Sequence, residues 1–231
     1  MYFLKIHFMI KSFIFDMDGV IVDNHSYHLH AWKIFCDEIN VSFNEAEFRH
    51  KYFGKNNFDI LSGLFSREVT QHEADELGER KELVYRQVYQ NHIKPVEGLV
   101  EILSELKKSG KFLAVASSAP VSNLNFVVDN LQIRSYFSCL LDGSSVSKAK
   151  PDPEIYIKTA KQLNVLPHEC VVFEDSISGI NAAQKAGMRV IALLTTHIRS
   201  ELPEVELYIK DFTDSKLISF LKQEFNYGSM N

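Results

Sequence analysis

Short apolar runs that alternate with helical patterns constrain the fold of this chain more than any other feature of its sequence. Five such runs are rich in β-branched and aromatic residues, which favours buried strands over fragments of helix. They end at Phe15, Ala116, Leu141, Phe173 and Leu194. Helical patterns lie between them, at residues 96–108, 153–165 and 177–188. The alternation predicts an α/β fold with a doubly wound, Rossmann-like parallel sheet and right-handed crossovers.

Residues 24–92 interrupt this alternation. No convincing strand occurs there, and the sequence instead contains four helical stretches, at residues 26–40, 44–52, 56–64 and 70–91. We therefore predict an inserted all-α domain, residues 24–92, after the first strand. Residues 1–23 and 93–231 are predicted to form the sheet domain together, and a chain of 231 residues is long enough for both units.

Composition and charge exclude several kinds of partner. The net charge is −5 and no long basic block occurs, so we expect no nucleic-acid partner. Three scattered cysteines, without paired or metal-like spacing, indicate a reducing compartment. The apolar N-terminal stretch is interrupted by Lys5, His7 and Lys11, and no apolar run reaches the ~18–20 residues of a membrane span. We expect a cytoplasmic protein without membrane contact, either a monomer or a weak homodimer.

Acidic, hydroxyl and lysine side chains follow four of the predicted strands. In chain order they are Asp16 and Asp18, Ser117 and Ser118, Lys148 and Lys150, and Glu174 and Asp175. Because ligands of open parallel sheets bind beyond the carboxyl ends of the strands, we expect these side chains to meet at one edge. Clustered carboxylates repel one another unless a cation holds them. Hard oxygen ligands on loops suit Mg²⁺, which binds alongside a phosphate.

These residue types can together carry out phosphoryl transfer. A carboxylate can attack phosphorus and form an aspartyl-phosphate, while a metal ion, a lysine and hydroxyl groups neutralise charge on the transferring oxygens. A second carboxylate, two residues away as in the Asp16/Asp18 pair, can protonate the leaving oxygen and later deprotonate the attacking hydroxyl. Gly19 would permit a sharp turn and leave room for the phosphate. Each motif alone is weak evidence, so the inference depends on all four following strands in one chain.

The four motifs resemble those of the haloacid dehalogenase superfamily. They read FDMDGV, VASS, SKAKPDP and VVFEDSISGINAAQKAGM, and residues 11–225 fit the superfamily pattern. With a helical cap inserted after the first motif, the chain is similar to the β-phosphoglucomutase-like subfamily. This resemblance implies a Rossmann-like core, an all-α cap and a Mg²⁺ cofactor.

The resemblance also implies a role for each matching residue. Asp16 resembles the nucleophile, and Asp18 the general acid/base, whose backbone carbonyl would bind Mg²⁺. Ser117, with Ser118 and Gly19 beside the phosphate, resembles the phosphate-binding group of the second motif. Lys150 is similar to the phosphate-clamping lysine, Asp175 to a metal ligand and Glu174 to a further ligand. Lys148 is an additional lysine, which we interpret as a solvated loop residue.

The cap matches β-phosphoglucomutases only in part. His28 would lie near the hinge, within reach of the acid/base, and Lys81 matches a lysine of that cap. Asn57 stands where those mutases have an arginine for the second phosphate of the substrate. Lys55, two residues earlier, could supply a substitute charge, although as a point donor rather than a bidentate fork. Trp32 is more readily explained as a core residue than as a substrate contact.

The sequence therefore predicts a Mg²⁺-dependent enzyme that transfers phosphoryl groups through an aspartyl-phosphate on Asp16. We expect hydrolysis of a small phosphorylated metabolite, a monoester such as a sugar phosphate. The alternative is a phosphomutase of the β-phosphoglucomutase type, which converts β-glucose 1-phosphate to glucose 6-phosphate. A pyrophosphatase, and a binding module built on an inactive site, are further alternatives. The presence of all four acidic and basic motif residues argues against the last of these.

Overall fold

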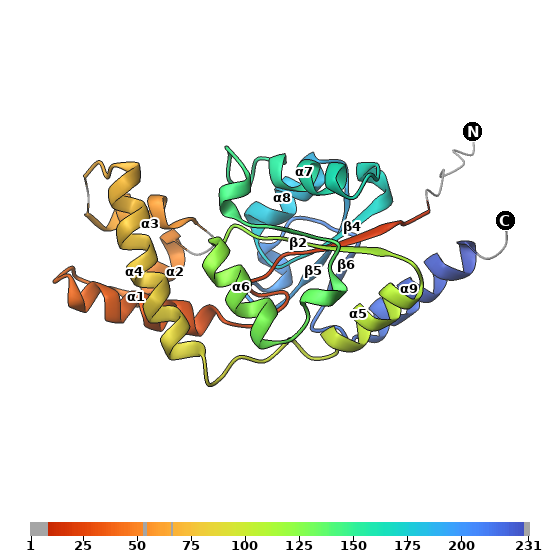
Figure 1. Cartoon of the computed structure of the whole chain (residues 1–231), viewed down its shortest axis with the longest axis horizontal. Coiled ribbons are helices and arrows are strands. Elements are labelled where there is room, and N and C mark those ends of the chain that lie inside the picture. Colours follow the sequence, from red (N-terminus) through yellow and green to blue (C-terminus); the bar gives the residue numbers. More distant parts are fainter. Residues whose placement is uncertain (1–8, 53–54, 66, 229–231) are drawn as a thin grey trace.

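A parallel sheet forms the centre of the protein (Figure 1). Its six strands lie in the order β3-β2-β1-β4-β5-β6. The computed structural model describes residues 9–52, 55–65 and 67–228. The strands are β1 (Ser12–Phe15), β2 (Phe112–Ala116), β3 (Cys139–Leu141), β4 (Cys170–Glu174), β5 (Arg189–Leu193) and β6 (Leu207–Ile209). The strand order reverses between β1 and β4, and an open α/β sheet binds its ligands at such a switch point.

Helices cover both faces of the sheet, which explains why the strands are apolar throughout. The helices of the core are α5 (Leu99–Lys108), α6 (Val121–Asn130), α7 (Glu154–Gln162), α8 (Ile177–Lys185) and α9 (Ser215–Gly228). In β1, Phe13 and Phe15 point into the cluster formed with α5, α6 and α9, whereas Ile14 points to α7 and α8. All three are fully buried, and each such side chain contributes roughly 1.5–3 kcal/mol to stability.

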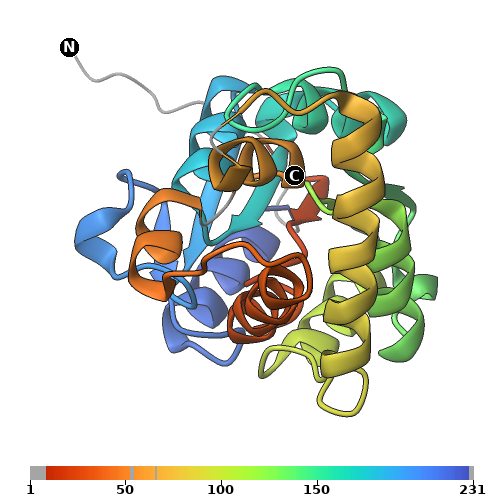
Figure 2. The same cartoon turned by 90° about the vertical axis from the view of Figure 1, so that its left-hand side faces the viewer.

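Four further helices form a separate cap between β1 and α5. They are α1 (His25–Glu38), α2 (Glu45–Tyr52), α3 (Asn57–Phe65) and α4 (Gln71–Tyr89). They lie together beyond one end of the sheet (Figures 1 and 2). The cap has an apolar cluster of its own, which includes Trp32, Phe35 and Phe48. Because this cluster is distinct from the two that flank the sheet, we propose residues 24–92 as the cap domain and residues 1–23 and 93–231 as the core domain.

The predicted fold class is confirmed, with differences at individual elements. The sequence analysis did not predict β6, α6 or α9. The helix predicted from residue 96 begins at Leu99, because Gly98 before it has a left-handed backbone with a φ of 79°. The helix predicted to extend to residue 188 ends at Lys185, and Gly187 (φ 78°) then reverses the chain. None of the helices in the described part of the chain is long and apolar enough to cross a membrane.

Candidate active site

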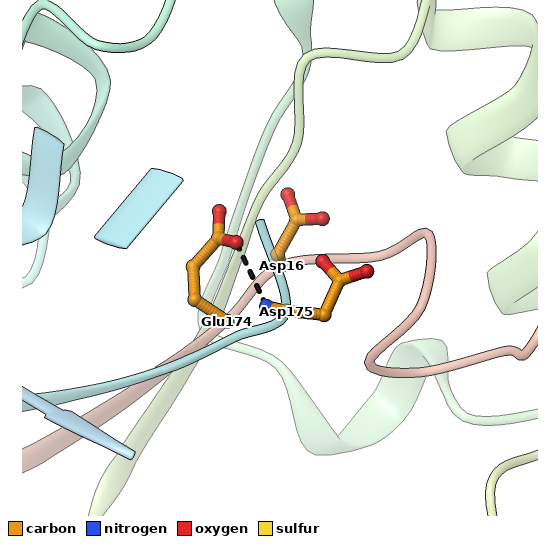
Figure 3. A group of neighbouring side chains, drawn as sticks. All are labelled: Asp16, Glu174 and Asp175. Atoms are coloured by element: carbon orange, nitrogen blue, oxygen red, sulfur yellow. Dashed lines mark hydrogen bonds between the residues drawn. The ribbon is translucent and has the colours of Figure 1, made fainter. Parts of the chain in front are cut away.

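Three carboxylates converge at the switch point of the sheet. β1 and β4 pair in register, with Phe15 opposite Phe173, so the acidic residues that follow these two phenylalanines are neighbours. Asp16, Glu174 and Asp175 each supply an oxygen, and these oxygens all lie within 4.8 Å of one another (Figure 3). All three residues are buried.

Lys150 joins this cluster from the loop that follows β3. Its Nζ donates to Asp16 Oδ1 at 2.6 Å, to Glu174 Oε1 at 2.8 Å and to the Ala116 carbonyl at 3.1 Å. The additional lysine of this loop, Lys148, is 73% exposed at its side chain and lies 3.9 Å from Asp152. The geometry therefore separates the two lysines, and only Lys150 reaches the carboxylates.

Glu174 is held by donors on both of its oxygens. Oε1 accepts from Lys150 and from Tyr156 Oη at 2.9 Å. Oε2 accepts from the backbone amides of Asp175 and Ser176, each at 2.9 Å, and from Ser176 Oγ at 3.0 Å. This carboxylate therefore fixes both the ammonium of Lys150 and the turn that begins α8.

The charges of the cluster suit a divalent cation. The formal charges of the three carboxylates and of Lys150 sum to −2 in a buried site. Burial acts to lower the pKa of His25, but Asp175 outweighs it and raises that pKa, so His25 can offset part of this charge. Burial raises the pKa of Asp16 well above its ordinary value, although Lys150 opposes this shift. Burial also acts to raise the pKa of Glu174, but the charge of Lys150 outweighs it and lowers that pKa. The charge of Lys150 therefore does not fully offset the burial of Asp16 and its repulsion by Glu174 and Asp175. Carboxylate oxygens are donors of the kind that Mg²⁺ prefers.

Asp18 occupies a polar position two residues beyond Asp16. Asn24 Nδ2 donates to Asp18 Oδ1 at 2.6 Å and also contacts Tyr85 Oη at 2.6 Å. Burial acts to raise the pKa of Asp18, but the neighbouring His28 and the amide of Asn24 outweigh it and lower that pKa to about 2. His28 Nε2 lies 3.7 Å from Asp18 Oδ1, too far for a hydrogen bond, so Asn24 is the direct partner. Asp18 is therefore ionised at neutral pH in the protein without substrate.

Asp175 contacts two side chains that the sequence analysis did not identify. His25 Nε2 lies 3.0 Å from Asp175 Oδ2, and Thr196 Oγ1 donates to the same oxygen. A Cβ on Gly19, whose φ is 79°, would lie 2.0 Å from Asp175 Oδ2 and 2.7 Å from His25 Nε2. The space that this glycine leaves is thus filled by Asp175 and His25, and Gly19 is not among the described residues that line the cavity.

A cavity of about 150 Å³ lies over these groups, between the sheet edge and the cap. Its core wall includes Ser117 and Ser118, which follow β2; Ser117 is buried, whereas Ser118 is exposed. The cap supplies an apolar part, made of Leu29, Trp32, Phe48, Tyr52 and Ile60. It also supplies a polar part, made of His28, Lys55, Asn56, Asn57, Lys81 and Glu82. The cavity can therefore hold a small molecule with one end at Asp16 and the other in the cap.

The cap residues that the sequence analysis selected differ in their exposure and in their contacts. Lys81 is 1% exposed, and its Nζ contacts His28 Nδ1 at 2.9 Å and Glu82 Oε1 at 3.0 Å. Lys55 is exposed, with its Nζ 5.7 Å from the centre of the Tyr52 ring. His28 stacks on the Tyr85 ring at 3.8 Å, and its Nε2 has no hydrogen-bond partner among the described residues.

Residues that support the site were found only in the structure. Thr195 and Thr196 follow β5, so the convergence of strand ends could have identified them; Thr195 Oγ1 donates to the Gly19 carbonyl at 2.6 Å. Tyr156 and Asn123, in contrast, reach the site from helices. No local signal marks them, because their contacts depend on how those helices pack.

Comparison with known proteins identifies the same family by a family model and by individual relatives. The family model described as haloacid dehalogenase-like hydrolase matches residues 13–193. The β-phosphoglucomutase of Bacillus subtilis (strain 168) is 30% identical over 80% of this chain and 83% of its own length. The phosphorylated carbohydrates phosphatase of Thermotoga maritima is 30% identical over 79% of this chain and 84% of its own.

Solved structures extend this similarity to the whole fold. The crystal structure of a haloacid dehalogenase hydrolase, family IA, variant 3, from Entamoeba histolytica has a TM-score of 0.83 and 25% identity. The match covers 93% of this chain and 100% of that one. The protein belongs to the haloacid dehalogenase-like hydrolase family, and it is an enzyme of the phosphatase and phosphomutase type.

Proposed function

We propose that the protein hydrolyses a small phosphate monoester, such as a sugar phosphate, through an aspartyl-phosphate on Asp16. The observation that carries this proposal is the placement of Asp16 Oδ1 at 2.6 Å from Lys150 Nζ, at the base of the cavity. A nucleophile and a cation for the phosphoryl oxygens are thereby in contact before substrate binds. The relatives that act on phosphorylated carbohydrates by name support this substrate class.

Mg²⁺ is the cofactor that the donor set fits. We propose Asp16 and Asp175 as its carboxylate ligands, with the backbone carbonyl of Asp18. Glu174 belongs to the same cluster, but both of its oxygens already accept hydrogen bonds from the protein. We therefore assign Glu174 first to positioning Lys150. Bound Mg²⁺ would supply positive charge beside the transferring phosphoryl oxygens.

The reaction then proceeds in two halves. In the first half, a carboxylate oxygen of Asp16 attacks phosphorus, and the ester bond breaks as Asp18 gives its proton to the leaving oxygen. Asp18 must first take up that proton from solvent, and the charge of an arriving phosphate raises its pKa in the required direction. In the second half, Asp18 takes a proton from water, the water oxygen attacks phosphorus, and Asp16 is released with inorganic phosphate.

The cavity also suggests groups that bind the substrate. Ser117 and Ser118 lie at the phosphate end, where their hydroxyl or backbone groups can donate to phosphoryl oxygens. His28 Nε2, which has no hydrogen-bond partner among the described residues, is available to a substrate oxygen. Lys55 and Lys81 lie at the cap end. A mutase needs a second anion site there, and Asn57 supplies an amide rather than a guanidinium.

Phosphate release measured beside isomerisation tests the proposed function. Sugar monophosphates and p-nitrophenyl phosphate are supplied with Mg²⁺, and EDTA serves as the metal-free control. β-Glucose 1-phosphate is assayed with a bisphosphate primer for conversion to glucose 6-phosphate. We expect phosphate release that EDTA abolishes, and weak or absent isomerisation. Isomerisation faster than release by roughly a hundredfold would establish the mutase alternative instead.

Replacement of Gly179 by alanine should disturb this arrangement through Glu174. An added Cβ would lie 1.6 Å from Glu174 Oε1, and the donors around Glu174 prevent that side chain from moving away. We expect Gly179→Ala to cost about 1–3 kcal/mol of stability and to reduce turnover roughly tenfold or more by displacing Lys150.

A variant of a second glycine, Gly110→Ala, is the control that distinguishes a loss of stability from a loss of activity. Gly110 has a φ of 71° and nothing within 4 Å of its ideal Cβ. Gly110→Ala should therefore lower stability by roughly 1–2 kcal/mol through its backbone alone and leave turnover unchanged. Thermal unfolding and steady-state turnover are measured for both variants. Equal turnover in the two would show that Gly179 does not protect the position of Lys150.

A further inference from the structure

The cap places a buried ion pair in the wall of the cavity, beside His28. Lys81 is 1% exposed and Glu82 is 3% exposed, and both line the cavity. Lys81 Nζ lies 3.0 Å from Glu82 Oε1 and 5.0 Å from the centre of the Trp32 ring. A lysine that could attract an anionic group is therefore already paired with a carboxylate of the cap itself.

Glu82 has hydrogen-bond donors on both of its oxygens. Asn57 Nδ2 donates to Oε1 at 2.9 Å, and Asn123 Nδ2 donates to Oε2 at 2.7 Å. Burial acts to raise the pKa of Glu82, but Lys81 outweighs it and lowers that pKa, so the carboxylate is ionised. The amide of Asn57, which stands where a mutase would need an anion-binding group, is thus turned toward Glu82.

The donors come from three parts of the chain. Asn57 begins α3 and Lys81 lies on α4, whereas Asn123 lies on α6 of the core. A carboxylate held from three sides cannot turn away to make room for an arriving anion. A phosphate that reaches this ion pair would find the charge of Lys81 offset by Glu82, so the pair offers it no net positive charge. Lys55 lies nearby, but it is exposed and solvent screens its charge.

We propose that Glu82 is a specificity-determining residue, which pairs with Lys81 so that the cavity accepts monophosphates with an uncharged distal end and rejects bisphosphates. This inference rests on the proposed function, because it assumes that the substrate phosphate binds at Asp16. It adds that the other end of the substrate carries hydroxyl groups, which can exchange hydrogen bonds with Asn57 and His28 without bringing charge.

Equilibrium binding tests the inference without any need for turnover. In an Asp16→Asn background with Mg²⁺, calorimetry compares two ligand pairs: glucose 6-phosphate with glucose 1,6-bisphosphate, and fructose 6-phosphate with fructose 1,6-bisphosphate. With Glu82 present, we expect the monophosphate of a pair to bind at least as tightly as its bisphosphate. Glu82→Gln should free Lys81 and raise the relative affinity for the bisphosphate roughly tenfold or more.

Glu79→Gln is the matched control for this substitution. It removes the same charge from the same helix, but Glu79 contacts Arg86 and Ser122 and is not among the described residues that line the cavity. We expect it to leave the ratio of the two affinities unchanged. The double substitution Lys81→Gln with Glu82→Gln removes both charges, and the ratio should return toward that of the parent.

Several outcomes would overturn the inference. If the protein with Glu82 intact binds the bisphosphate roughly tenfold more tightly than the monophosphate, the inference is wrong. This comparison does not need the Glu82→Gln variant, so it remains possible if that variant does not fold. An unchanged ratio in folded Glu82→Gln contradicts it as well. The proposed function fails separately, if the wild-type protein releases no phosphate from any monophosphate or from p-nitrophenyl phosphate.

Discussion

Asp16→Asn is expected to reduce turnover by roughly a thousandfold or more. The amide keeps the shape of the side chain, but it lacks the negative charge with which the carboxylate attacks phosphorus. The measurement is phosphate release from a sugar phosphate, together with mass spectrometry of the protein after rapid acid quenching. We expect to detect phosphorylated protein in the wild type and no phosphorylated protein in the variant.

The fold should survive this substitution. Asp16 is one of three carboxylates around a single ammonium, so removing its charge relieves repulsion from Glu174 and Asp175. The melting temperature in the absence of metal should stay the same or rise. Asp23→Asn is the matched control, because Asp23 is an exposed acid of the same loop, and it should keep full activity. Residual activity of Asp16→Asn above about a tenth of wild type would contradict a covalent mechanism on this residue.

The core of the site could be predicted because it follows from local sequence and topology. An apolar run predicts a buried strand, and the residue after a parallel strand lies at the ligand-binding edge whatever the details of packing. Asp16, Lys150 and Asp175 were identified in this way, and the structure brings them together. The rule alone identifies a loop and not which of its side chains turns inward. The interpretation of Lys148 as a solvated loop residue is confirmed, because its side chain is exposed.

The rest of the site depends on packing between distant segments. Glu82 and Asn123 are 41 residues apart and meet only because α4 of the cap lies against α6 of the core. The sequence analysis considered the anion site from Asn57, Lys55 and Lys81, and it did not consider the carboxylate next to Lys81. β6 was missed for a different reason: its three residues lie between Glu206 and Lys210, so the apolar run is too short to indicate a strand.

The second large effect is expected for Asp18→Asn, and it should depend on the leaving group. An amide cannot give a proton to the leaving oxygen, nor take one from water, so both halves of the reaction lose their acid or base catalyst. Positioned proton transfer typically contributes 10²–10⁴-fold, and we expect a loss of roughly that size with a sugar phosphate. The metal site should be retained, because the ligand proposed from this residue is its backbone carbonyl.

p-Nitrophenyl phosphate distinguishes the two halves in the same variant. Its leaving group departs as an anion without protonation, so the first half should still occur and phosphorylate Asp16. Water would then lack its base, and the phosphorylated protein should accumulate. Stopped-flow absorbance should therefore show a burst of one p-nitrophenolate per protein, followed by slow turnover, whereas a sugar phosphate should give no burst.

The control for this experiment is Tyr85→Phe. It removes the hydroxyl that contacts Asn24 but leaves the hydrogen bond from Asn24 to Asp18, and Phe preserves the ring on which His28 stacks. We expect less than about a tenfold loss and no burst, because the acid/base itself is intact. If Asp18→Asn turns over a sugar phosphate at more than about a tenth of the wild-type rate, Asp18 is not the general acid/base. A missing burst with p-nitrophenyl phosphate, in a variant that still binds Mg²⁺, would instead show that Asp18 is needed before the leaving group departs.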